Sequence, residues 1–254
     1  MEIVVRGLQP YQKHVLAGAF GIAPFRDALT RKDALDAARN GDFSVTKWIY
    51  DTLGGIVSLS DLMMAAVGKG QLATLKQLHL LEKPGNFIRL GEIMREAVRS
   101  GGLPTVAWML ANMVPRGWGC VSVVECAAEQ GNLEALKLLT EAGFWRSCNV
   151  CWHAAYHGHL DCLVYAHQNG YPVDKRICSL AAEKGHFECL KYAHESGGDL
   201  ADSLFSAAYY GHLECMKYAH ENGSRITSHV VSVVRERGHL ECLQYAQLHL
   251  NHGV

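Results

Sequence analysis

A short segment recurs along almost the whole chain, and this repetition constrains the fold more than any other feature. The copies are clearest after Cys151, where they read HAAYHGHLDCLVYAHQNG, LAAEKGHFECLKYAHESG, SAAYYGHLECMKYAHENG and VVRERGHLECLQYAQLHL. Weaker copies precede them, and one glycine anchors each copy: Gly41, Gly70, Gly101, Gly131, Gly158, Gly185, Gly211 and Gly238. The last four glycines are 26 or 27 residues apart. Eight copies therefore cover residues 30–254, and a fixed period of this length is typical of stacked repeat proteins.

Each copy predicts two short helices. In the fifth copy the second helix begins at the histidine after the glycine, and Leu160, Leu163 and Ala166 form its apolar stripe. The first helix of each copy ends in a pair of small residues, such as Ala181 and Ala182, which lets neighbouring helices approach closely. One position of the second helix carries cysteines, which we expect to be small buried apolar side chains: Cys162, Cys189, Cys215 and Cys242. The predicted fold class is an all-α helix-turn-helix solenoid.

These residues resemble the ankyrin repeat. Residues 150–161 match the A-A-x-x-G-H-L core of that repeat, and residues 134–139 match its second helix. The resemblance implies an ankyrin-like solenoid of about eight repeats. The copies are shorter than the ~33-residue ankyrin repeat, so we expect short loops in place of projecting β-hairpin fingers. Such short copies resemble those of protists and large DNA viruses of amoebae, which favours a role in host–pathogen interaction.

The resemblance also implies a protein partner bound through the concave face of the array. In ankyrin folds the two residues between the Ala-Ala pair and the glycine are exposed in the binding groove. In this chain they vary from copy to copy, whereas the frame around them stays nearly constant. We expect the partner to contact these positions: Arg39, Asn40, Lys69, Arg99, Glu129, Gln130, Tyr156, His157, Glu183, Lys184, Tyr209, Tyr210, Glu236 and Arg237.

The centre of the expected surface is a patch of four residues with aromatic rings: Tyr156, His157, Tyr209 and Tyr210. Tyrosine and arginine are the side chains that most often anchor protein interfaces. A basic stretch from the first copies accompanies this patch: Arg39, Lys69 and Arg99. The competing interpretation is that these positions vary freely in solvent and that the tyrosines pack partly against neighbouring copies.

Charge and composition narrow the class of partner and the compartment. The formal net charge is −1, which gives no electrostatic reason to hold a phosphate backbone or an anionic membrane surface. We therefore expect no nucleic-acid partner and no membrane partner. The chain has nine cysteines, an odd number that cannot be fully paired in disulfides, and no recognisable secretory leader. These features favour free thiols in a reducing compartment, and the predicted location is cytoplasmic.

One cluster suggests a metal site. Cys148 and Cys151 form a Cys-x-x-Cys motif, and His153, His157 and His159 follow it closely. Structural zinc requires four ligands in a tetrahedral array, and a single Cys-x-x-Cys supplies half of them. Cys151, His153 and His159 also occupy positions that the repeat itself explains, which favours a chain without a metal or another cofactor.

No catalytic motif accompanies the repeats. The sequence contains no G-x-S-x-G, no H-E-x-x-H and no phosphate-binding G-x-x-x-x-G-K-[ST]. The preferred hypothesis is a non-enzymatic protein-binding scaffold. The alternative is a structural subunit that is built permanently into a large multiprotein assembly.

A second histidine recurs near the end of the second helix in three copies: His167, His194 and His220. This position places a cation or a hydrogen-bond donor near the carboxyl end of the helix dipole. Since several histidines titrate together near neutral pH, we also expect stability to depend on pH.

The two ends depart from the repeat. Residues 1–29 do not repeat, and we expect an arm or a cap that covers the first copy. Apolar residues of the last copy are expected to be less well covered than those in the middle: Val230, Val231, Val233, Val234 and Leu243. That exposure would allow end-to-end contact between two copies of the chain at the C-terminal repeat, and simple fraying is the other interpretation.

Overall fold

The structure, a computed structural model, describes residues 8–20, 29–82, 89–115, 119–144, 147, 149–174 and 176–250. Every regular element in these ranges is an α-helix, and the described residues contain no β-strand. The chain divides into two compact units, residues 1–118 (unit 1) and residues 119–254 (unit 2). The all-α prediction is confirmed.

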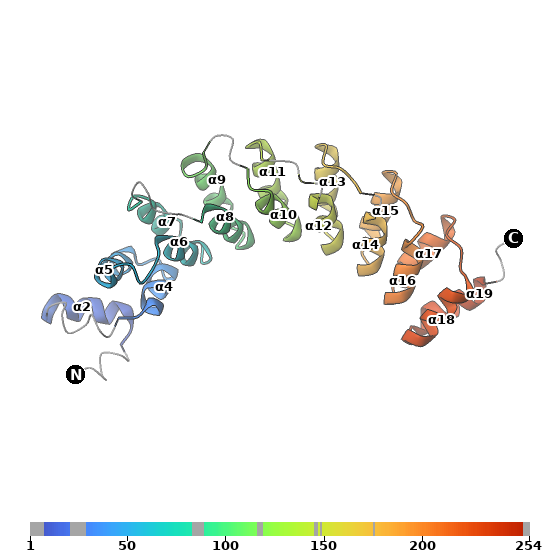
Figure 1. Cartoon of the computed structure of the whole chain (residues 1–254), viewed down its shortest axis with the longest axis horizontal. Coiled ribbons are helices and arrows are strands. Elements are labelled where there is room, and N and C mark those ends of the chain that lie inside the picture. Colours follow the sequence, from blue (N-terminus) through green and yellow to red (C-terminus); the bar gives the residue numbers. More distant parts are fainter. Residues whose placement is uncertain are drawn as a thin grey trace. The chain divides into compact units, whose positions relative to one another are not determined.

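Unit 1 consists of α2 (Pro10–Phe20) followed by three helix pairs. The pairs are α4 (Arg31–Arg39) with α5 (Phe43–Leu53), α6 (Leu59–Val67) with α7 (Leu72–His79), and α8 (Leu90–Arg99) with α9 (Leu103–Asn112) (Figure 1). The first helices α4, α6 and α8 pack against one another in chain order, and each also packs against the second helix of its own pair.

Unit 2 consists of five helix pairs. The pairs are α10 (Val121–Glu129) with α11 (Leu133–Glu141), α12 (Asn149–His157) with α13 (Leu160–Gln168), α14 (Ile177–Lys184) with α15 (Phe187–Glu195), α16 (Ser203–Tyr210) with α17 (Leu213–Glu221), and α18 (Ser228–Arg237) with α19 (Leu240–His249) (Figure 1). The first helices α10 to α18 form one layer, and the second helices α11 to α19 form the other.

Small side chains occupy the contacts between first helices. Ala181 and Ala182 of α14 are fully buried, as are the corresponding Ala154 and Ala155 of α12. Because an alanine adds only a methyl group, adjacent helices can approach closely at these positions. The predicted burial of the recurring cysteines is also confirmed, with about 1% exposure at each position: Cys162, Cys189, Cys215 and Cys242.

A glycine of one copy and a histidine of the next copy connect neighbouring repeats. Gly185 ends α14 with φ of 74°, in the left-handed region that favours glycine. The Nε2 atom of His212 in the next copy lies 3.0 Å from the backbone oxygen of Glu183. Since a carbonyl oxygen only accepts, Nε2 carries the proton and donates it. A Cβ atom on residue 185 would lie 2.5 Å from Nδ1 of the same ring, so the close approach also requires glycine.

The same arrangement recurs along unit 2. Nε2 of His159 lies 3.0 Å from a carbonyl oxygen of the preceding copy and its ring covers Gly131, and His239 lies in the same way against Gly211 at 3.1 Å. In unit 1 the amide of Gln71 takes the place of the histidine and donates to the preceding copy at 3.3 Å. We call this contact the glycine–histidine contact. It fixes each helix end relative to the next copy.

Helix α2 lies against the first helix pair of unit 1. Nζ of Lys13, whose side chain is 2% exposed, forms an ion pair with Asp33 of α4 at 3.0 Å. Ala17 is buried and packs with Leu16 and Trp48. Residues 1–7 and 21–28 lie outside the described residues, so the assignment of residues 1–29 to a separate arm or cap stays a prediction.

The expectation of poor burial in the last copy is wrong for three of the five residues named. Val230, Val231 and Val234 are buried, because α18 packs between α16 and α19. Val233 and Leu243 are half-buried. The exposed apolar side chains of this copy lie on α19 instead, where Leu240 and Leu248 are 70% and 69% exposed.

The glycine–histidine contact predicts a difference between two equivalent glycines. Gly185 and Gly238 have φ of 74° and 75°, but a Cβ atom at residue 238 would meet nothing within 4 Å. Gly185→Ala should therefore destabilise the chain by about 1–3 kcal/mol more than Gly238→Ala, because the ring of His212 must leave its place. Urea unfolding of the two variants measures this difference. Equal losses would show that backbone strain alone determines the cost.

Candidate partner-binding surface

The predicted contact positions lie at the C-terminal ends of the first helices, directly after the buried small residues. In unit 1 all four predicted side chains are exposed: Arg39, Asn40, Lys69 and Arg99. In unit 2 five are exposed: Gln130, His157, Tyr210, Glu236 and Arg237. The other five of unit 2 are half-buried: Glu129, Tyr156, Glu183, Lys184 and Tyr209. We call the ten residues of unit 2 the helix-end surface.

Within the helix-end surface, tyrosines and cations of successive copies lie against one another. Nζ of Lys184 lies 4.5 Å from the ring centroid of Tyr156 and 5.8 Å from that of Tyr210, so one lysine connects rings of the copies on either side. The guanidinium carbon of Arg237 lies 3.7 Å from the ring centroid of Tyr209. Such cation–π contacts attract the cation to the ring face and orient both side chains.

Local hydrogen bonds hold Lys184 in its charged form. Hydrogen bonds to Tyr156 and to Glu183 raise the pKa of Lys184 above its usual value, and burial opposes this only weakly. Its ion pair with the Glu183 carboxylate is 3.0 Å long. At any physiological pH, Lys184 is therefore charged and contacts the tyrosine rings of the two neighbouring copies.

The four residues of the predicted patch occupy one region of unit 2. Tyr209 and Tyr210 meet edge to face at a centroid distance of 5.0 Å, and Tyr156 meets His157 in the same way at 5.1 Å. The interpretation in which the tyrosines pack partly against neighbours also describes Tyr156 and Tyr209, which are half-buried. The patch therefore contains two half-buried tyrosines that pack against neighbours and two exposed residues, His157 and Tyr210.

Two aromatic residues of this region were not predicted from the sequence. The ring of Trp152 stacks on Tyr156 at 4.8 Å, and Phe205 lies 6.1 Å from Tyr209. Phe205 also stacks on His229 of the next copy at 5.5 Å. Both missed residues precede a predicted tyrosine by one helical turn, and the i, i+4 spacing was the signal available to find them.

The basic stretch of unit 1 is largely paired with acidic residues. Arg39 forms an ion pair with Asp36 at 2.8 Å, and Arg99 forms one with Glu96 at 3.1 Å, in each case one turn apart on the same helix. Lys69 lines a pocket of about 490 Å³ together with side chains of α4, α6 and α8, including Leu35 and Met64. The excess of positive charge at these helix ends is therefore smaller than the sequence positions suggest.

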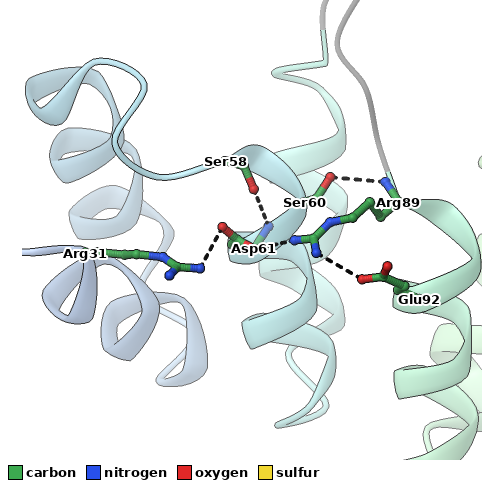
Figure 2. A network of polar contacts seen from close by, with 6 residues as sticks. All are labelled: Arg31, Ser58, Ser60, Asp61, Arg89 and Glu92. Atoms are coloured by element: carbon green, nitrogen blue, oxygen red, sulfur yellow. Dashed lines mark hydrogen bonds and ion pairs between the residues drawn. The ribbon is translucent and has the colours of Figure 1, made fainter.

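A polar network joins the three first helices of unit 1 at their N-terminal ends (Figure 2). Asp61 of α6 accepts hydrogen bonds from Arg31 of α4 at 3.0 Å and from Arg89, which precedes α8. Arg89 also reaches Glu92 at 3.1 Å. Burial acts to raise the pKa of Asp61, but the Ser58 hydroxyl and the two arginines outweigh it and hold that pKa below its usual value. The network is a structural connection between copies.

Two of the residues that suggested a zinc site, Cys151 and His159, have other partners. Cys148 lies outside the described residues, and among those described no three His, Cys, Asp or Glu side chains are placed to hold a metal ion. Cys151 is buried, and burial raises the pKa of its thiol to about 12. Nε2 of His159 donates to the carbonyl of Glu129 at 3.0 Å.

The second column of histidines connects the second helices to one another. Nδ1 of His167 lies 2.9 Å from the hydroxyl of Tyr192 in the next copy. His194 with Tyr218, and His220 with Tyr245, repeat this contact at the same distance. The interpretation based on the helix dipole omitted this partner, because the tyrosine lies 24 or 25 residues away in the sequence.

The pKa values of three histidines predict how stability depends on pH. Burial lowers the pKa of His157, His186 and His220 below the usual value of about 6.5. Between the lowered values and about 6.5 the unfolded chain binds more protons, so stability is highest above about pH 6.5 and falls as the pH drops through this window. Urea midpoints measured from ~pH 7.5 to ~pH 5.5 check this, and a flat or rising midpoint would contradict it.

A conservative variant separates titration from packing. Gln71 occupies the histidine position in unit 1, so His186→Gln should keep the contact to the preceding copy and remove one titrating group. We expect a shallower fall of the urea midpoint in this variant and an unchanged midpoint above about pH 7. An unchanged slope would exclude His186 as a contributor.

Among the described residues, no helix is long and apolar enough to cross a membrane. Residues 151–194 match the family model described as "Ankyrin repeats (many copies)". The crystal structure of the human ASB11 ankyrin repeat domain is similar to this chain, with a TM-score of 0.60 and 17% sequence identity, over 72% of this chain and 96% of that one. No curated protein matches the sequence.

The structural match supports the fold, and the family match supports the resemblance seen in the sequence. Ankyrin repeats generally mediate protein–protein interaction and are typically non-enzymatic modules. The chain therefore carries ankyrin repeats in residues 151–194 and has the all-α fold of an ankyrin-repeat solenoid.

Proposed function

We propose that the chain is a non-enzymatic scaffold that binds a partner protein through the face formed by its first helices, which is the concave face in ankyrin folds. The observation that carries this proposal is the helix-end surface. It presents Tyr156, Tyr209 and Tyr210 from alternate copies, connected by Lys184 and Arg237. Tyrosine, tryptophan and arginine contribute most often to the energetic centres of interfaces.

The division between a constant frame and variable ends supports the same function. In unit 2 the buried small residues, the glycines Gly131, Gly158, Gly185 and Gly211 and the histidine rings that cover these glycines are engaged in contacts between copies. The side chains of the two residues between them are not part of this frame, and they are exposed or half-buried. A rigid frame also lowers the entropic cost of binding, because Tyr156 and Lys184 are already ordered by their neighbours.

The alternative proposal, a structural subunit of a large assembly, has one observation in its favour. Leu240 and Leu248 leave large apolar side chains exposed on α19. A further layer of helices, from another protein or from a second copy, would cover them. An obligate assembly buries a much larger area than a binding scaffold, ~2,000 Å² or more.

Free thiols at the described cysteines are consistent with a cytoplasmic location, which we also propose.

The scaffold proposal predicts that two surface tyrosines are needed for capture of a partner. Tyr209→Ala with Tyr210→Ala should reduce recovery of the dominant captured protein by about tenfold or more, since two central anchors are lost. The measurement is affinity capture from native lysate followed by quantitative mass spectrometry. Light scattering and circular dichroism establish that each variant is folded and monomeric.

The matched control changes the same residue type outside the helix-end surface. Tyr50 of α5 and Tyr165 of α13 are half-buried on second helices. Replacing both by alanine should leave capture intact. If the Tyr209 and Tyr210 variant recovers as much of the partner as the wild-type chain does, the assignment of this surface is refuted. If the wild-type chain is recovered only inside one large complex, the structural-subunit alternative is favoured.

A further inference from the structure

The near-zero net charge of the chain conceals a difference between its two units. Residues 1–118 contain 14 Lys and Arg against 10 Asp and Glu, whereas residues 119–254 contain 10 Lys and Arg against 15 Asp and Glu. Unit 2, which carries the aromatic cluster, therefore has a formal excess of five negative charges when histidine is neutral. A partner that docks on unit 2 meets a negative field.

Carboxylates alternate with tyrosines along the helix-end surface. At the position of Tyr156 the five successive copies of unit 2 carry Glu129, Tyr156, Glu183, Tyr209 and Glu236. Because α10 to α18 pack in chain order, equivalent residues form a row across the layer. We call these five residues the glutamate–tyrosine row. The row lies at the carboxyl ends of five helices, where the helix dipoles add negative potential.

The cations already present on this surface are occupied within the chain. Lys184 pairs with Glu183 at 3.0 Å and lies over Tyr156, and Arg237 lies over Tyr209. The carboxylates at the two ends of the row differ from Glu183. Among the described residues, no lysine or arginine lies within ion-pair distance of Glu129 or Glu236. With Lys184 and Glu183 paired, two carboxylates (Glu129 and Glu236) and one guanidinium (Arg237) remain on this surface, so its remaining formal charge is negative when His157 is neutral.

We propose that the partner presents an arginine-bearing segment to the glutamate–tyrosine row. This inference rests on the proposed function and names the chemistry of the segment that is bound. A guanidinium group stacks on an aromatic face and pairs with a carboxylate through two parallel hydrogen bonds, and the row offers both kinds of group side by side. The contacts of Arg237 and Lys184 with Tyr209 and Tyr156 show that these rings accept cations on their faces.

An acidic segment fits the same row less well. It would compete with Glu183 and two rings for Lys184, and with the ring of Tyr209 for Arg237. It would also bring its carboxylates towards Glu129 and Glu236, and juxtaposed like charges across an interface are unfavourable. A purely apolar segment would desolvate the two end carboxylates without supplying a cation, and Glu236 would keep only its hydrogen bond from Ser232 at 3.2 Å.

The test uses labelled peptides of defined charge and the full chain. One peptide carries arginines spaced along an alanine–glutamine background, and two counterparts carry lysine or glutamate at the same places. Fluorescence anisotropy measures their affinities at low and at physiological salt. We expect the arginine peptide to bind tightest, the lysine peptide more weakly because it cannot form the planar paired contact, and the glutamate peptide weakest.

A pair of variants with equal charge change locates the binding. Glu129→Gln with Glu236→Gln should weaken the arginine peptide by about tenfold, because both end carboxylates are neutralised without a change of shape. The control, Glu141→Gln with Glu221→Gln, removes the same charge from exposed positions on the second helices α11 and α17 and should have little effect. Urea unfolding confirms that all variants remain folded.

Three results would overturn the inference: tightest binding of the glutamate peptide, equal loss of affinity in both double variants, or no saturable binding of the arginine peptide. None of them decides the proposed function. That function fails separately, if the Tyr209 and Tyr210 variant captures its partner as well as the wild-type chain does. The two failures are therefore distinguishable.

Discussion

The contact between the left-handed glycine of one copy and the histidine of the next is the interaction on which the stacking of unit 2 depends. The ring of His212 lies where a side chain on Gly185 would be, and its Nε2 donates to the backbone at the end of α14. Each such contact satisfies a carbonyl group that the helix itself leaves without a partner. It also fixes the spacing and orientation of adjacent copies, since a repeat of two short helices has no stable position alone.

This contact also explains why the candidate site lies where it does. The carbonyl that accepts from the histidine belongs to the first of the two variable residues, as at Glu129 and at Tyr209. The frame therefore holds the backbone of these residues, while their side chains vary from copy to copy and contact one another or lie in solvent. Variation at two positions in each copy can change the surface without changing the fold, which is the physical basis of a binding array.

Most of the fold was predictable from the sequence, because period, small residues and glycines each have a direct structural meaning. The site was predictable only in part. Position in the repeat located Tyr156, Tyr209 and Tyr210, but the cation–π contacts of Lys184 and Arg237 connect different copies and have no sequence signature. Burial of Val230 and Val234 was mispredicted because it depends on how α18 packs between its neighbours. The ion pairs that reduce the basic character of unit 1 join residues three apart on one helix, a spacing that the sequence displays but that the prediction of a basic stretch did not take into account.

The most direct test of the account is site-specific photo-crosslinking in native lysate. A photoreactive phenylalanine analogue is placed either at the position of Tyr210, on the helix-end surface, or at the position of Leu248, on the exposed side of α19. The account predicts one dominant crosslinked protein from position 210 and none from position 248. Crosslinking from position 248 alone would contradict the account and would indicate that the partner covers the last helix instead of the ends of the first helices.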